Sequence, residues 1–202
     1  MKKILYLIVL VATLTITTQS TQAQAWEKNT KVLGIGFGAS QFFHIDGSAS
    51  AYYGNFYSPL TGQLNFQGEF GVHDYVGIGF TTGVGGRAGY YRSYGYLGYY
   101  GSYGSAGEVN VPVGILANFH FYQLIADKTG KDIHADKLDI YAGLNVGGGI
   151  AAVFYSTETR IVPIAFGGVQ VGARYYFTDK IGVNVEVGFP KLVHAGLVFK
   201  LQ

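Results

Sequence analysis

Four polar residues stand inside stretches of the chain that otherwise alternate between apolar and small residues. Glu69, Asn184 and Glu186, together with Arg174, each occupy a position opposite the apolar side chains of their stretch. Carboxylates that face a guanidinium could form a charged constriction that selects ions. The same groups could instead form a buried ion pair that fills a narrow interior. The alternating pattern of the chain predicts a ring of eight strands. We favour the ion pair, because the interior of such a ring is just wide enough for side chains.

A second candidate is the segment 85–108, which is rich in Gly, Ser and Tyr. Tyrosine offers a broad apolar face and a hydroxyl at low entropic cost, so binding loops favour it. The segment could hold an extracellular glycan, a protein partner or lipopolysaccharide. The alternative is that neighbouring strands extend through it and its tyrosines form an aromatic girdle. These tyrosines are Tyr90, Tyr91, Tyr94, Tyr96, Tyr99, Tyr100 and Tyr103.

Other chemistry finds little support. His44, Asp46 and Ser48 superficially resemble a hydrolase site, but a nucleophile and its base need a geometry that sequence does not give. The chain has no cysteine and no His-Glu-x-x-His motif. Its glycine runs, such as 147–149, do not open a helix as a nucleotide loop would. We therefore expect no catalytic residues, no cofactor and no metal.

Composition narrows the class of protein. Only 13% of the 202 residues are charged, about half of the roughly 25% usual in soluble domains. The formal net charge is +2, glycine numbers 31, and 49% of the residues are hydrophobic. These values exclude a disordered chain and disfavour a nucleic-acid binder.

The first 25 residues have the pattern of a secretory signal peptide. Lys2 and Lys3 precede an apolar run, and Ala23 and Ala25 form a small-x-small cleavage site. We predict export through the inner membrane and cleavage after Ala25, so that 1–25 is a signal peptide and 26–202 is the mature domain. Removal of two lysines leaves 12 basic residues against 12 acidic ones.

The remaining chain alternates with a period of two, which predicts β-strands. Each stretch approaches the roughly 9–11 residues that a tilted strand needs to cross a bilayer. The charges within the strands lie opposite the apolar face, where a barrel interior would hold them. The pattern predicts an all-β, eight-stranded antiparallel up-and-down transmembrane β-barrel, although a soluble β-sandwich would alternate too. The expected strands are 32–39, 63–72, 75–84, 109–121, 138–150, 164–177, 181–189 and 193–201.

This topology predicts long connections at one end and short ones at the other. With both termini in the periplasm, the inner turns are 73–74, 122–137 and 178–180. The outer loops are 41–62, 85–108, 151–162 and 190–192. The inner connection 122–137 is long for a periplasmic turn.

The last third resembles small bacterial outer-membrane barrels of the OmpA/OmpX type. The segment 172–182 reads as a strand, a tight Thr-Asp-Lys turn and the start of another strand. The end of the chain is similar to the terminal signal that these proteins present to the assembly machinery. That signal has a polar residue, a glycine, an aromatic and a hydrophobic residue, which correspond to His194, Gly196, Phe199 and Leu201. This chain departs from the pattern because Gln202 follows.

The resemblance implies an outer-membrane location, so that 26–202 is an outer-membrane β-barrel domain, but it implies little about activity. We expect a structural or surface-interaction role through long extracellular loops. A narrow porin-like channel for ions or small solutes is the alternative, and a lipid-modifying enzyme is the third. The expected partners are outer-membrane lipid, the outer-membrane assembly machinery and an extracellular glycan or protein, with no nucleic acid.

Overall fold

The computed structural model describes residues 24–45, 54–57, 61–93, 102–130, 134–155 and 158–201. Ten strands and one helix lie in these ranges, and the strands belong to one sheet. In chain order they are β1 (Lys31–Ser40), β2 (Phe43–His44), β3 (Gly54–Tyr57), β4 (Thr61–His73), β5 (Val76–Ser93), β6 (Ser102–Phe119), α3 (Phe121–Thr129), β7 (Leu138–Tyr155), β8 (Thr159–Tyr176), β9 (Ile181–Gly188) and β10 (Lys191–Leu201).

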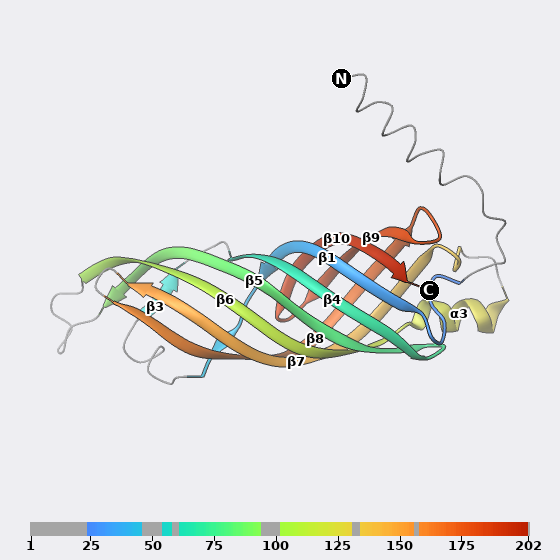
Figure 1. Cartoon of the computed structure of the whole chain (residues 1–202), viewed down its shortest axis with the longest axis horizontal. Helices are drawn as coiled ribbons and strands as arrows, with labels where there is room; N and C mark the ends of the chain where they lie inside the picture. Colours follow the sequence, from blue (N-terminus) through green and yellow to red (C-terminus); the bar gives the residue numbers. More distant parts are fainter. Residues whose placement is uncertain are drawn as a thin grey trace, which may run out of the picture.

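Eight of these strands close into a ring (Figure 1). From β4 to β10 each long strand pairs antiparallel with the next one along the chain, and β1 pairs with both β4 and β10. The seam between β1 and β10 runs from Lys31 opposite Leu201 to Ser40 opposite Lys191. The predicted eight-stranded up-and-down barrel is confirmed.

The barrel has its apolar side chains on the outside. Successive side chains of a strand point to opposite faces, so alternation separates two surfaces. Phe37 is 64% exposed on the outer face of β1, whereas Glu69 and Arg174 are buried in the interior. A soluble β-sandwich would bury the apolar face instead. The sandwich alternative is wrong, because the strands close into a ring whose outer face is apolar, and such a face is stable in lipid and not in water.

Glycines make room for large side chains in the narrow interior. A β-carbon at Gly172 would lie 2.4 Å from the ring of Tyr141, and one at Gly77 would lie 2.7 Å from the ring of Trp26. Atoms do not approach this closely, so the glycines and the aromatic rings depend on each other.

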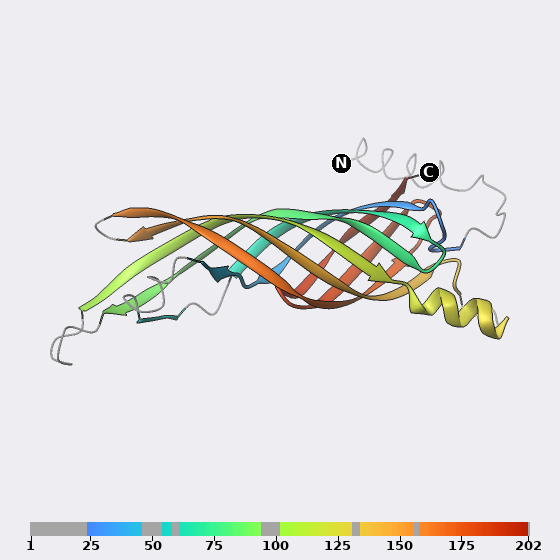
Figure 2. The same cartoon turned by 90° about the horizontal axis from the view of Figure 1, so that it is seen from below.

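One side of the barrel is much taller than the other (Figure 2). Strands β5 to β8 have 18 residues each, whereas β1, β9 and β10 have 10, 8 and 11. The amide of Phe189, at the tip of the short side, donates to the carbonyl of Val169 at 2.8 Å, and β8 continues beyond this point to Thr159. We call this projecting part of β5–β8 the far wall, and the opposite end, where β1 begins and β10 ends, the near end.

The far wall corrects two of the predicted loops. Most of 85–108 and 151–162 is strand, and the pairing of β5 with β6 continues to Ser93 opposite Ser102. Polar and glycine-rich sequence suggested loops, but pairing between backbones does not require apolar side chains. The alternative that the strands extend is therefore confirmed.

The predicted outer loop 41–62 also contains strand. Strand β2 pairs with the edge of β8 beyond the tip of β9, with Phe43 opposite Ala165. Strand β3 pairs with the edge of β5, with Gly54 opposite Arg92. One connection thus pairs with both edges of the far wall, where unpaired backbone groups would otherwise remain.

The predicted turn 122–137 was wrong in part, because it contains most of helix α3. The helix ends at Gly130, which adopts the left-handed conformation and donates its amide to the carbonyl of Ala126 at 2.9 Å. The hydroxyl of Tyr75, in the neighbouring turn, donates to Asp127 on the helix and so raises the pKa of the phenol. Within the described ranges, no helix has the length and apolarity needed to cross a membrane.

A closed barrel of this kind should resist unfolding by detergent. We expect the protein, extracted without heating, to migrate faster in a denaturing gel than a boiled sample, because the hydrogen-bonded ring keeps it compact. Equal migration of both samples, with full solubility in the absence of detergent, would contradict the barrel.

Candidate functional site

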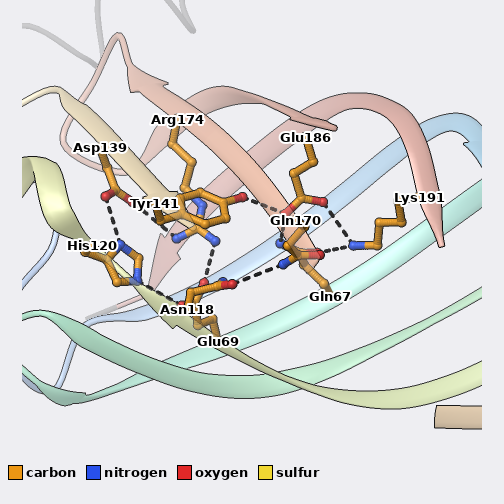
Figure 3. A network of polar contacts seen from close by, with 10 residues as sticks. All are labelled: Gln67, Glu69, Asn118, His120, Asp139, Tyr141, Gln170, Arg174, Glu186 and Lys191. Atoms are coloured by element: carbon orange, nitrogen blue, oxygen red, sulfur yellow. Dashed lines mark hydrogen bonds and ion pairs between the residues drawn. The ribbon is translucent and has the colours of Figure 1, made fainter. Parts of the chain in front are cut away.

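The interior at the near end holds a cluster of ionisable side chains (Figure 3). His120 lies between two carboxylates, with Nδ1 at 2.8 Å from Asp139 and Nε2 at 2.9 Å from Glu69. Arg174 donates to the same two residues, to Glu69 and, at 3.4 Å, to Asp139. With the imidazole protonated, two positive and two negative charges balance. Such balance matters because burying an unpaired ion is costly.

Trp26 covers this cluster. Its ring stacks on His120 with centroids 3.6 Å apart and planes 6° from parallel, and Arg174 lies 5.8 Å from its centroid. The segment before β1 is anchored by backbone hydrogen bonds between Asn29, Thr30 and Gly71. Trp26 is fully buried and packs with Val32, Tyr176 and Val198. The chain therefore plugs its own barrel with the residues that precede the first strand.

A second group lies deeper in the barrel around Glu186. Tyr141 donates to this carboxylate at 2.6 Å, the amide of Gln67 at 2.9 Å and Lys191 at 3.0 Å. Lys191 also donates to the side-chain oxygen of Gln67. Tyr141 links the two groups, because Arg174 lies over its ring at 4.3 Å.

Amide side chains on the adjacent strands β6, β7 and β8 extend the network along one wall of the barrel. Asn145 donates to Gln170 at 3.1 Å, and Gln170 donates to Asn118 at 3.0 Å. All three side chains are buried. These buried amides on neighbouring strands thus supply hydrogen-bond partners to one another.

The four predicted interior residues all face inward, but they form two groups instead of one. Glu69 and Arg174 meet, Glu186 bonds to Lys191, and Asn184 is buried opposite Arg174 in the strand register. The side chain of Lys191 corrects the prediction of an outer loop over 190–192. Strand β10 begins at Lys191, and the side chain is buried. Its place beside a tight turn suggested contact with water, and only the fold showed that it points inward.

Sequence reasoning also missed His120, Asp139 and Trp26 as members of the cluster. The alternation placed the first two on the interior face, but it could not give their heights in the barrel. Trp26 precedes the first strand, outside any alternating pattern.

The other predicted groups are only partly described. Tyr90 and Tyr91 lie on β5, and Tyr103 lies on β6. Tyr94, Tyr96, Tyr99 and Tyr100 lie outside the described residues, as do Asp46, Ser48 and Ala23. Ala25, the other predicted cleavage residue, is buried, and its amide donates to the carbonyl of Ala135 at 2.8 Å. The four residues of the predicted assembly signal lie on β10 at the seam.

Little open space remains beside the polar network. A cavity of about 10 Å³ lies between Asn65, Gln67, Glu186 and His194. This is near the least volume that holds one water molecule. A groove of about 830 Å³, lined by residues such as Leu144 and Val169, lies across the apolar outer wall instead.

One interior pair superficially resembles a catalytic dyad. The hydroxyl of Ser40 lies 2.9 Å from Nε2 of His194, and both side chains are buried. No carboxylate among the described residues bonds to the other ring nitrogen, Nδ1 of His194. The described residues also hold no group of three metal-ligating side chains.

The comparisons with known proteins find this architecture in solved structures. The crystal structure of OprG, an outer membrane protein of Pseudomonas aeruginosa, matches with a TM-score of 0.56 and 10% identity, over 91% of this chain and 100% of that one. The N-terminal β-barrel domain of OprF from Pseudomonas aeruginosa matches with a TM-score of 0.52 and 11% identity, over 87% and 99%. The chain has the fold of the small eight-stranded outer-membrane β-barrels. No protein-family model and no curated protein matches its sequence.

The buried cluster should make a large contribution to stability. Arg174→Met leaves His120 as the one cation facing two buried carboxylates and should lower the free energy of unfolding by about 3–5 kcal/mol. Urea unfolding followed by fluorescence measures this directly, because Trp26 is the one tryptophan of the chain and lies in the cluster. Arg160→Met is the matched control, since Arg160 pairs with Glu158 at a part-exposed site and should cost about 0–1 kcal/mol. Equal losses in both variants would contradict the assigned role.

His120 should make stability depend on pH. Burial lowers the pKa of His120, but the hydrogen bonds to Asp139 and Glu69 raise it by a larger amount. The pKa of His120 in the folded protein is therefore above 6.5. The stabilisation is complete below about pH 6.5 and is lost as the pH rises through the folded pKa. For the native chain, we expect the urea concentration at the midpoint of unfolding to fall as the pH rises through the folded pKa of His120. His120→Gln should remove this part of the dependence, and an unchanged pH profile would contradict it.

Proposed function

We propose that this chain is an outer-membrane protein that closes its own lumen and presents the far wall as a contact surface outside the cell. The observation that carries the proposal is the pairing of Glu69 with Arg174 and of Glu186 with Gln67 across the interior, with Lys191 beside Glu186. These groups occupy the space that a channel would need. The long strands then serve to hold a surface away from the membrane.

The distribution of side chains supports the membrane placement. The exposed apolar residues encircle the barrel, whereas the charges of the central strands point inward. The near end carries two short turns and the short helix α3, and the far end carries the longer strands. In transmembrane barrels short turns lie in the periplasm and long connections outside. The near end, with both termini of the barrel, therefore belongs in the periplasm.

The far wall supplies a suitable contact surface. The β5–β6 hairpin is the tyrosine-rich segment of the chain, and its strands pair as far as Ser93 and Ser102. A rigid hairpin loses little entropy when it binds, and tyrosine can both pack and donate a hydrogen bond. An extracellular glycan or a protein is the partner that this chemistry suits.

The seam suggests how the barrel is recognised before it closes. His194, Gly196, Phe199 and Leu201 lie on β10, whose edge pairs with β1 only when the ring is complete. Until then that edge is free to pair with another strand. We assign recognition by the outer-membrane assembly machinery to this strand.

Shortening the β5–β6 hairpin tests the contact surface. Ala88 pairs with Gly107, so replacing 89–106 by Asn-Gly joins the strands in register through a two-residue turn. We expect cells that carry this variant to lose binding to immobilised glycans or extracellular proteins. The matched control replaces 154–159 by Asn-Gly between Val153 and Arg160, which are also paired, and should keep that binding.

Two outcomes would contradict the proposal. Unchanged binding with the shortened β5–β6 hairpin would contradict the proposed contact surface. Steady ion conductance of the native protein in planar bilayers would contradict a closed lumen and favour a narrow channel for ions or small solutes.

A further inference from the structure

The outer face of the far wall is apolar, and no other described segment of the chain covers it. Val109 and Val111 on β6, Ile150 and Phe154 on β7, and Ile161 on β8 are between 40% and 65% exposed. In the described part of the far wall, no charged side chain points outward from β6, β7 or β8. Such a surface is unusual on a protein face that contacts water.

These residues form one continuous surface. Val109 lies opposite Ala152, which lies opposite Ile161. In the adjacent row, Val111 lies opposite Ile150, which lies opposite Pro163. Neighbouring strands are about 4.8 Å apart and the two rows are about 6.6 Å apart along each strand, so these side chains form a continuous surface. We call this surface, with Phe154 beside it, the far-wall patch.

The patch stands above the hydrocarbon core of the membrane. The 10 residues of β1, at about 3.3 Å each and tilted by about 40°, rise roughly 25 Å, which matches the apolar band of a transmembrane barrel. The short side therefore spans the core once, and β8 passes its tip at Val169. The rest of β8, from Gly168 to Thr159, extends beyond the core by a similar height. A flat bilayer cannot cover both sides of the barrel, because their apolar heights differ about twofold.

The membrane restricts what can cover the patch. The patch faces sideways and continues downward into the lipid-facing belt at Val146 and Val169, which are also exposed. A partner that lies against the patch therefore also lies beside the membrane-spanning wall. A second copy meets this condition, because copies inserted in the same direction carry the patch at the same height.

Charge also permits contact between identical surfaces. The patch is uncharged, and at its edge Arg160 and Glu158 pair with each other at 2.8 Å. Two copies therefore bring no like charges together. We propose that two copies of this chain pair through their far-wall patches, around a two-fold axis parallel to the barrel axis. This inference rests on the proposed outer-membrane placement.

Cysteine cross-linking in native outer membranes tests the dimer, because the chain has no cysteine of its own. Ile150→Cys and Ile161→Cys place a thiol in the patch, near the expected axis. Val185→Cys is the matched control, since Val185 is equally exposed but lies on β9, on the short side. After oxidation with copper phenanthroline, we expect a disulfide-linked species of twice the chain mass from the patch variants and only traces from the control.

A charge variant separates loss of the dimer from loss of the fold. Ile150→Glu, added to Ile161→Cys, brings two carboxylates together at the axis and should abolish the cross-link. The unboiled sample should still migrate faster than the boiled one, which shows that the barrel is intact.

Several results would overturn the dimer. They are cross-linking of Val185→Cys as efficient as that of the patch variants, absence of a dimer from both patch variants, and an adduct with a different mass. Absence of the protein from outer-membrane fractions would instead contradict the proposed function. A heat-modifiable barrel in that membrane without a dimer would contradict this inference alone.

Discussion

The hydrogen-bonded seam between β1 and β10 is the contact on which the rest of the structure depends. Lipid offers no partner for a backbone amide or carbonyl, so a sheet can cross a membrane only if it has no free edge. The seam pairs the two ends of the chain from Lys31 to Ser40 and so fixes the number of strands in the ring. That number sets the circumference, and the circumference leaves an interior only as wide as its side chains.

A narrow interior then requires that its polar groups satisfy one another. Glu69, Asp139, His120 and Arg174 come from four different strands or their ends, and each is buried. None could stay charged alone, but together they neutralise and hydrogen-bond each other. Trp26 completes the arrangement with a ring that covers His120. The interior is thus a small polar core, which holds the wall in place and occupies the space that a pore would need.

The difference in height between the two sides of the barrel has a separate physical cause. A strand needs only enough residues to cross the hydrocarbon, and β1, β9 and β10 stop near that length. Strands β5 to β8 continue because each pairs with a neighbour of the same length. Their free edges are paired with β2 and β3, which come from one connection. The inner face of this wall is covered, since Ala151, Val153, Val162 and Ile164 pack with Phe42 and Tyr155. The outer face has no such cover within the described part of the chain.

The sequence by itself determined the eight strands of the ring and the face to which their side chains point. Alternation between Leu33, Ile35 and Phe37 on one face and glycine on the other is a local property, because the period of two belongs to every strand. Only the tertiary structure decided which interior residues meet. Glu69 and Arg174 are 105 residues apart, and their contact depends on the register of every strand between them. The sequence also did not show the helix α3, the inward side chain of Lys191 or the height of the far wall. The position of Lys191 and the height of the far wall depend on how neighbouring strands pair, and pairing acts between backbones, which look alike along the whole chain.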